Sequence, residues 1–411
     1  MTNNLENSTD PKVKTGQHNE NERKIPHVNG HIHTPYSFSA FTNVEQAFQL
    51  ADAENIKVLG INDFNTFDGY REFTEMGLKY NMYPLLNIEF MGLIAEFQRK
   101  GIRVNDPANP GRIYFSGKGM DFPVNLTGKN ESKFNAVKQE SLLQAKEMLE
   151  KASAYLKIFD PSLSLDYHEI MEKYTRGMLR ERHIAKAIRE KIYTKYSSGS
   201  DRESFLQTIF QKKEVKSSID NLAGIENEIR SNLLKAGGPA FVKENTEAFL
   251  PLEEILEIIR SGGGIPCYPV LLDDSKGNFT EFESDKEQLL KNLQANNIFC
   301  IELIPNRNDF DIFKEFVQFF HAHGFIILFG TEHDTPELTP LTVSARGNRS
   351  LDDNLKKINY EGACIIAAHQ YLRARGEQSL NSADFSFTNT VKNDFIKLGE
   401  TVISNYCSTK N

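Results

Sequence analysis

Short apolar runs alternate with longer amphipathic runs from residue 27 onward, and this alternation constrains the fold more than any other feature. The runs VNGHIHT, VLGINDF and YPLLNIEFMG have the composition of strands, and residues 44–55 and 70–80 between them have helical spacing. This order predicts parallel βαβ units, in which functional side chains lie at the carboxyl ends of the strands. Residues 25–95 are therefore expected to form the first part of an α/β barrel.

The alternation stops over residues 96–250 and then resumes. This stretch opens with a loop rich in Gly, Pro and Asn and continues in charged helical segments such as ESLLQAKEMLEKASAYL, which predicts a mainly helical insertion. Residues 251–345 again contain strand-like runs, in GGIPCYPVLL, NIFCIELIPN and HGFIILFGTEHD. A chain of 411 residues is long enough for one barrel and one inserted lobe. The barrel is thus expected to be interrupted in sequence but continuous in space.

The two ends and the composition predict a soluble, cytoplasmic protein. Residues 1–24 are polar and lack an apolar core, so we expect a disordered tail rather than a signal sequence or a membrane anchor. Residues 346–411 regain a helical pattern and are expected to pack on the barrel. The net charge of −8 and the pI of about 5.8 argue against nucleic acid or a membrane as the main partner. Neither disulfides nor a zinc knuckle is expected, because the cysteines lack paired spacing: Cys267, Cys300, Cys364 and Cys407.

Candidate metal ligands follow several of the predicted strands. His31 and His33 stand at alternate positions at the end of the first strand, an arrangement that commonly holds a divalent metal. Glu89 follows at the end of a later strand, and Glu332, His333 and Asp334 follow the last apolar strand. Several candidate ligands at several strand ends are harder to produce by chance than one pair of histidines. The sequence therefore predicts a metal site at the carboxyl face of the barrel.

Short motifs, taken in order along the chain, resemble those of the PHP family, the polymerase and histidinol phosphatase superfamily. HIHTPYSFS resembles the first motif, INDFNTFDG the second, NIEF the third and GTEHD the last. RERHIAKAI resembles a histidine-bearing helix of PHP phosphoesterases that carry a helical insertion, and GGIPCYPV resembles a strand that usually ends in His-Pro. The resemblance runs from about residue 27 to residue 340. It implies an irregular (β/α)7-type PHP barrel with a mostly helical insertion.

The same resemblance implies a reduced set of metal sites. Members of the family often bind three metals, and the first would be held here by His31, His33, Glu89 and Glu332, the last standing where the family usually has Asp. His333 is an alternative to Glu332 as the fourth ligand. The positions that match the other two sites carry Tyr114, Tyr268, Phe38, Phe64 and Asp334, of which four are aromatic. One divalent ion is therefore expected, and two histidines with two carboxylates suit Zn, Mn or Fe.

Several polar residues near these motifs have two interpretations each. Asp63 is either a turn or helix-capping residue or the partner that orients a ligand histidine. His183 is more often a capping or core histidine than a functional one. Glu302 ends a predicted strand near the site. Tyrosine hydroxyls at the vacated positions can donate hydrogen bonds or protons. The candidate catalytic residues are Asp63, His183, Tyr268 and Asp334.

Basic residues could recognise an anionic substrate. The loop NDPANPGRIYFSGKG carries Arg112 and Lys118 among glycines, and a flexible basic loop over a barrel mouth can clamp phosphate or carboxylate. Cations of the insertion, such as Arg176, Arg180 and Arg182, could add anion contacts but are usually solvated. The predicted substrate contacts are Arg112, Tyr114, Lys118 and His333, and the expected substrate is a small anionic molecule.

Three functions remain open from the sequence. The resemblance implies metal-dependent hydrolysis of a phosphoester on a small metabolite or nucleotide. The loss of two metal sites favours an alternative, a mononuclear lyase, aldolase or isomerase that acts on a sugar or hydroxy acid and uses Tyr or Asp to move protons. The third function is non-catalytic ligand binding. Retention of all the ligand types of the first site argues against the third.

Overall fold

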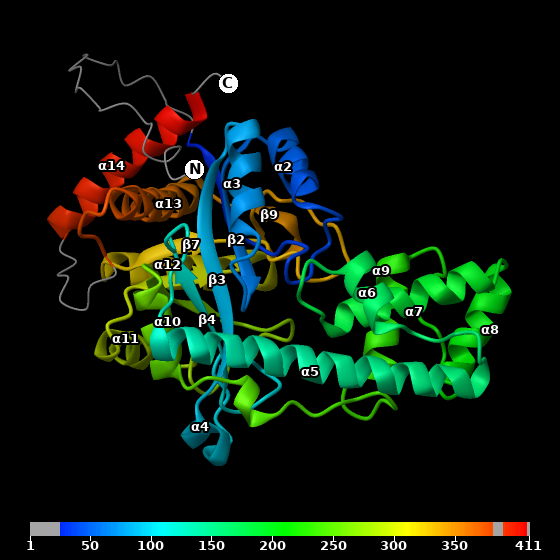
Figure 1. Ribbon diagram of the computed structural model, residues 1–411. Helices are drawn as coiled ribbons and strands as arrows, with labels where there is room; N and C mark the ends of the chain where they lie inside the picture. Colours follow the sequence, from blue (N-terminus) through cyan, green and yellow to red (C-terminus); the bar gives the residue numbers. More distant parts are fainter. Residues whose placement is uncertain (1–24, 381–388, 409–411) are drawn as a thin grey trace.

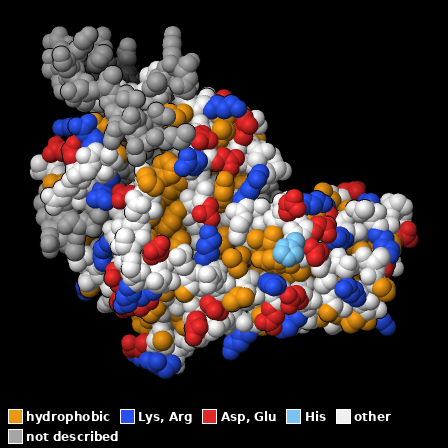
Figure 2. Space-filling model, in the orientation of Figure 1, with side chains coloured by type: hydrophobic (Ala, Val, Ile, Leu, Met, Phe, Trp, Pro, Cys, Tyr) orange, Lys and Arg blue, Asp and Glu red, His pale blue; other side chains and the backbone are white. Residues whose placement is uncertain are grey.

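The computed structural model of the chain describes residues 25–380 and 389–408 and consists of a barrel with a helical lobe extending from one side (Figure 1). The tail predicted over residues 1–24 lies outside the described residues. Acidic and basic side chains are interspersed over the face shown in Figure 2. None of the described helices is long and apolar enough to cross a membrane.

Seven strands form one sheet in which each strand pairs with its neighbours in chain order. The strands are β1 (His27–Ile32), β2 (Ile56–Phe64), β3 (Tyr83–Leu93), β4 (Arg112–Lys118), β5 (Ile265–Val270), β6 (Cys300–Leu303) and β7 (Ile326–Phe329). Pairing is parallel except that β4 is antiparallel to both of its neighbours. A parallel bridge between Ile32 and Glu332 joins the end of β1 to the segment after β7. The sheet is thus nearly closed, and the predicted irregular seven-stranded barrel is confirmed.

Strand side chains alternate between the inside and the outside of the barrel because successive residues point to opposite faces of a sheet. Val58 and Leu85 belong to an inner apolar cluster that also includes residues of the C-terminal helices. Leu59 and Leu86 belong to the cluster beneath the outer helices. Farther along β2, Asn62 turns inward and contacts His31. The barrel is therefore apolar at the amino ends of its strands and polar at their carboxyl ends.

The helices that cover the barrel begin at polar caps or short turns. They are α2 (Val44–Ala53), α3 (Tyr70–Lys79), α10 (Leu252–Ser261), α11 (Lys286–Ala295), α12 (Phe310–Ala322), α13 (Asp353–Ala374) and α14 (Asn389–Ser408). The short α4 (Ala95–Lys100) follows β3, projects away from the barrel and has no buried residue (Figure 1). Asn43, Asp285 and Asp309 accept hydrogen bonds from backbone N–H groups in the first turns of α2, α11 and α12, which satisfies donors left free at a helix start. Helix α13 packs against β7 and β1, and α14 packs on α13.

The helical lobe has an apolar core of its own. It contains α5 (Gly128–Phe159), α6 (Tyr167–Tyr174), α7 (Glu181–Lys195), α8 (Gly199–Ile209), α9 (Leu222–Ile229) and the π-helix η1 (Arg230–Leu234). Strand β4 precedes the lobe and belongs to the barrel, although the sequence predicted residues 96–250 as insertion. The prediction of a flexible loop over Arg112 and Lys118 is therefore wrong, because glycines that suggested a loop stand within or beside an antiparallel strand.

His369 on α13 is expected to make the fold less stable in mild acid. Its Nε2 bonds to the Gly263 carbonyl at 2.8 Å and its Nδ1 lies 2.7 Å from Ser379 Oγ. Burial lowers the pKa of His369 to about 4, so the unfolded chain takes up the proton first as the pH falls. This difference removes about 1.4 kcal/mol of stability between pH 7.5 and pH 5.5.

Urea unfolding of the wild type and His369→Gln at both pH values checks this. Other titrating groups are common to the two proteins, so the wild type should lose about 1.4 kcal/mol more than the variant. Equal losses in the two proteins would contradict the assignment.

Candidate metal centre

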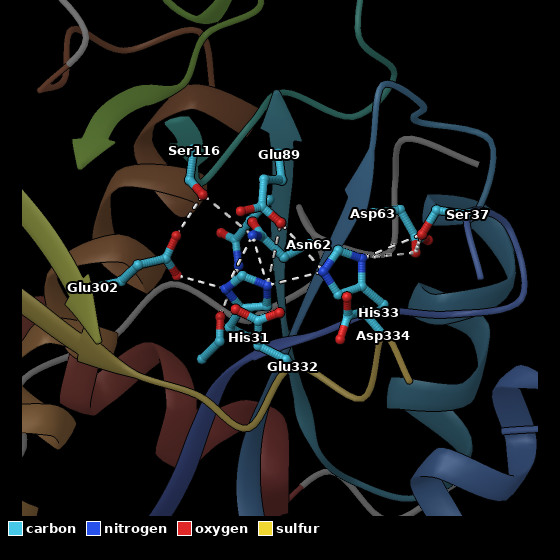
Figure 3. A network of polar contacts seen from close by, with 12 residues as sticks. His31, His33, Ser37, Asn62, Asp63, Glu89, Ser116, Glu302, Glu332 and Asp334 are labelled. Atoms are coloured by element: carbon cyan, nitrogen blue, oxygen red, sulfur yellow. Dashed lines mark hydrogen bonds and ion pairs between the residues drawn. The ribbon is translucent and has the colours of Figure 1, made fainter. Parts of the chain in front are cut away.

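His31, His33 and Glu89 place three ligand atoms around one point at the carboxyl end of the barrel (Figure 3). His31 stands in β1, His33 follows that strand directly, and Glu89 lies in β3. His31 Nε2 is 3.3 Å from His33 Nε2, and Glu89 Oε2 is 3.7 Å and 3.2 Å from these two nitrogens. All three side chains are buried.

The three atoms fit a divalent ion. A tetrahedral ion with bonds of about 2.1 Å separates its ligand atoms by about 3.4 Å, close to the three separations found here. Glu89 Oε2 is buried and has no hydrogen-bond partner among the described residues, so its lone pairs can coordinate a cation. Burial raises the pKa of Glu89 well above its usual value, since nothing compensates the charge fully. These donors suit Zn, Mn or Fe.

A buried charge network fixes the ring of His31. Glu302 Oε2, at the end of β6, lies 2.9 Å from His31 Nδ1, so the proton on Nδ1 leaves Nε2 free to face His33 and Glu89. Lys118 Nζ lies 2.5 Å from the same carboxylate oxygen, and Ser116 donates to the other oxygen. Burial alone would raise the pKa of Glu302, but Lys118 and His31 hold it below its usual range. Glu302 is therefore an ionised orienting group.

Asp63 organises the loop that carries His33. Its carboxylate accepts hydrogen bonds from the Thr34 backbone N–H at 2.7 Å, from Thr34 Oγ1 at 2.5 Å and from Ser37 Oγ at 2.6 Å. Ser37 Oγ lies 3.3 Å from His33 Nδ1, whereas Asp63 itself is 3.9 Å from that nitrogen. Helix α3 is preceded by Gly69, so Asp63 is not its cap. Asp63 therefore holds the loop that carries His33, in keeping with the second of its two interpretations.

The backbone after β7 separates Glu332 from His333. Both residues have positive φ, 67° and 63°, in the left-handed region that non-glycine residues rarely adopt. Glu332 lines the cavity described below, and Arg307 Nη1 holds its carboxylate at 2.9 Å. His333 turns away, stacks on Phe41 and uses both nitrogens, on Thr331 Oγ1 and the Thr339 carbonyl, each at 2.9 Å. Of the two alternatives for a fourth ligand, Glu332 is the one that lines the cavity, whereas the ligand atoms grouped within reach of one ion come from His31, His33 and Glu89.

The aromatic residues at the other family positions have different surroundings. Phe38, Phe64 and Tyr114 line the cavity. Phe64 stacks on His33 with ring centroids 4.6 Å apart. Tyr268 points outward instead, into the cluster beneath the outer helices, where its hydroxyl donates to Glu283 at 2.7 Å. The predicted catalytic role of Tyr268 therefore has no support from its position.

His183 stands in the first turn of α7. Its Nδ1 accepts the Arg180 backbone N–H at 3.0 Å, and its ring meets Phe38 edge-on at 4.9 Å. Burial lowers the pKa of His183 to about 3. The structure thus places His183 as a capping histidine that is neutral near pH 7, in keeping with the blander of its two interpretations.

A cavity of about 400 Å³ lies between the barrel mouth and the helical lobe, with His31 and Glu89 among its lining residues. Asp334 also lines it and lies 3.9 Å from Arg182 of α7. Arg112 lines the cavity but is paired with Glu244. Lys118 is fully buried inside the barrel and contacts Glu302 instead of the cavity. Sequence reasoning missed both the role of Lys118 and that of Glu302.

The known proteins that resemble this chain do so in fold. No family model matches the sequence, and no curated protein matches it. A solved structure of a provisionally assigned metal-dependent phosphoesterase from Bifidobacterium adolescentis is 14% identical, with a TM-score of 0.50 over 82% of this chain and 96% of that one. An amidohydrolase from Chromobacterium violaceum, solved with bound sulfate and no metal, is 14% identical with a TM-score of 0.49 over 81% and 96%. The predicted likeness to PHP-like enzymes is confirmed at the level of the barrel fold.

Proposed function

We propose that this protein is a metal-dependent hydrolase that uses one divalent ion to cleave a phosphoester of a small anionic metabolite. The observation that carries the proposal is the triangle of His31 Nε2, His33 Nε2 and Glu89 Oε2, whose size fits one ion and whose carboxylate oxygen is buried without a hydrogen-bond partner. The name of the Bifidobacterium protein with this fold agrees with the proposed chemistry.

The residues around the triangle have separate tasks in this proposal. His31, His33 and Glu89 hold the ion, which when bound supplies Lewis acidity to the reacting group. Glu302 keeps His31 in the tautomer that exposes Nε2. Asp334 is a carboxylate in the cavity, and Arg182 and His33 lower its pKa against the effect of burial. Asp334 is therefore ionised near pH 7 and can accept a hydrogen bond that orients an attacking water.

The lyase or isomerase alternative is less well supported. That alternative used Tyr114, Tyr268 or Asp334 to move protons, and the hydroxyl of Tyr268 is bonded to Glu283 outside the cavity. Tyr114 remains in the cavity, and burial raises its pKa above its usual value, so it is a poor proton donor near neutral pH. Asp334 serves either reaction, so the alternative is weakened by the positions and pKa values of its two tyrosines.

Elemental analysis followed by phosphoester assays tests the proposal. Purified protein should contain about one Zn, Mn or Fe per chain, and it should release phosphate from a subset of phosphoesters only when the metal is present. Tyr268→Phe should keep this activity within about twofold, since the lost hydroxyl contributes about 1 kcal/mol to stability and nothing to the cavity.

Two or three metals per chain would contradict the single-ion site. Conversion of a sugar acid or ketose, with no phosphate released from any ester and with sensitivity to Tyr268→Phe, would establish the lyase alternative.

A further inference from the structure

We infer that Arg180 binds an anionic group of the substrate, a phosphate or carboxylate, inside the cavity that contains the metal centre. This inference rests on the proposed function in one respect: the reacting end of the substrate is taken to lie at the His31, His33 and Glu89 triangle. Arg180 belongs to the helical lobe and directly precedes α7. The lobe thereby supplies part of the binding site.

Charge pairing within the cavity singles out Arg180. The other basic side chains that line it each have a carboxylate within 4.0 Å. These pairs are Arg112 with Glu244, Arg182 with Asp334, Arg230 and Lys235 with Glu181, and Arg307 with Glu332. Among the residues that the structure describes, no carboxylate oxygen lies within 4.0 Å of the Arg180 side-chain nitrogens. Arg180 acts on Asp334 only at longer range and makes no ion pair with a described residue, so its guanidinium N–H groups can pair with an anionic ligand.

The position of Arg180 lets one small ligand reach both it and the metal triangle. Its guanidinium carbon lies 4.6 Å from the centroid of the Phe64 ring, and that ring stacks on His33 at 4.6 Å. One aromatic ring therefore separates the guanidinium group from a metal-binding imidazole. Phe64, Arg180, His31 and Glu89 all line the same cavity. A single ligand within this cavity can therefore contact Arg180 at one end and the metal triangle at the other.

His183 and Phe64 hold Arg180 in place but form no ion pair with its guanidinium group. Its backbone N–H is fixed by His183 Nδ1 at 3.0 Å, and its guanidinium group rests on the face of Phe64. The planar guanidinium presents paired N–H donors that match the oxygens of phosphate or carboxylate. The cavity of about 400 Å³ is in the range that takes a small metabolite. The expected ligand has a reacting ester at one end and a second oxyanion at the other.

Calorimetric titration of metal-free protein with inorganic phosphate and with malonate tests this inference. Removal of metal by a chelator excludes anion binding through the ion. Arg180→Gln should weaken binding of the preferred anion by at least about tenfold, because one charge-assisted hydrogen-bonding group is lost. Arg176→Gln is the matched control, since Arg176 is exposed, lies four residues earlier and does not line the cavity. The affinity of Arg176→Gln for the preferred anion should stay within about twofold of that of the wild type.

Of phosphate and malonate, the one that binds the wild type more tightly is the preferred anion. Absence of binding in the wild type, equal affinity in Arg180→Gln, or an equal loss in Arg176→Gln would each overturn the inference. Arg180→Lys, which keeps the charge, should recover part of the affinity and so separates recognition from misfolding. If the wild type binds the anion through Arg180 but cleaves no phosphoester, the proposed function fails while this inference stands. If cleavage depends on metal but KM is unchanged in Arg180→Gln, the inference alone fails.

Discussion

Glu89→Gln is expected to abolish metal binding and to lower hydrolysis by more than about a hundredfold. Loss of a group that only orients a ligand already reduces metal affinity or activity by about 10–100-fold, so loss of a direct ligand should have a larger effect. Glutamine keeps the shape of the side chain but removes the negative charge that a divalent ion requires. Elemental analysis should find about one metal per chain in the wild type and almost none in Glu89→Gln. The rate of phosphate release is measured on the same two proteins.

The same substitution should have the opposite effect on the metal-free protein. Glu89 Oε2 is buried without a hydrogen-bond partner, and a buried uncompensated charge is unfavourable. Removing the charge should therefore raise or preserve the melting temperature without metal. Added metal should raise the melting temperature of the wild type alone, because a ligand stabilises only a protein that binds it.

Glu283→Gln is the matched control for a buried carboxylate outside the cavity. Glu283 accepts hydrogen bonds from Tyr268 and from the backbone of Leu271 and Leu272, and burial raises its pKa to about 7. This variant can lose stability but should keep its metal. Metal retention in Glu89→Gln equal to that in Glu283→Gln would show that Glu89 is not a ligand.

The metal triangle could be predicted from sequence because its parts lie at the ends of recognisable strands. His31, His33 and Glu89 follow apolar runs of parallel βαβ units, and parallel strands bring their carboxyl ends to one face. The α/β barrel and the helical lobe followed from the same alternation, whereas the count of seven strands came from the resemblance to the PHP family. The local apolar pattern was sufficient to predict this site, because each ligand residue is positioned by the strand in which it lies or which it directly follows.

The network behind the triangle could not be predicted in this way. Lys118 lies among glycines, as in a loop, and its burial follows from the antiparallel pairing of β4 between β3 and β5, which no local pattern encodes. Its contact with Glu302 joins residues 184 positions apart. The choice between Glu332 and His333 likewise depended on two left-handed residues after β7. A left-handed backbone conformation is usually marked in a sequence by glycine, and neither of these two positions is a glycine.

Lys118→Met is expected to destabilise the protein by about 3–5 kcal/mol, because removal of one partner leaves the other as a buried uncompensated charge. Lys118 and Glu302 are both buried, and their charged atoms are 2.5 Å apart. Urea unfolding measures the loss. Lys79→Met, at the exposed pair of Lys79 with Glu45, is the control and should leave stability unchanged.

The double variant Lys118→Met/Glu302→Gln separates the two tasks of the pair. With neither charge present, stability should recover most of what Lys118→Met loses, since no buried charge is left uncompensated. Metal affinity should remain about tenfold or more below that of the wild type, because the Nδ1 proton of His31 no longer meets a carboxylate. Recovery of metal affinity together with stability would mean that Glu302 does not orient His31. If the double variant recovers stability but not metal affinity, Glu302 is needed to orient His31. Lys118 then acts on the metal centre indirectly, by stabilising the charge of Glu302.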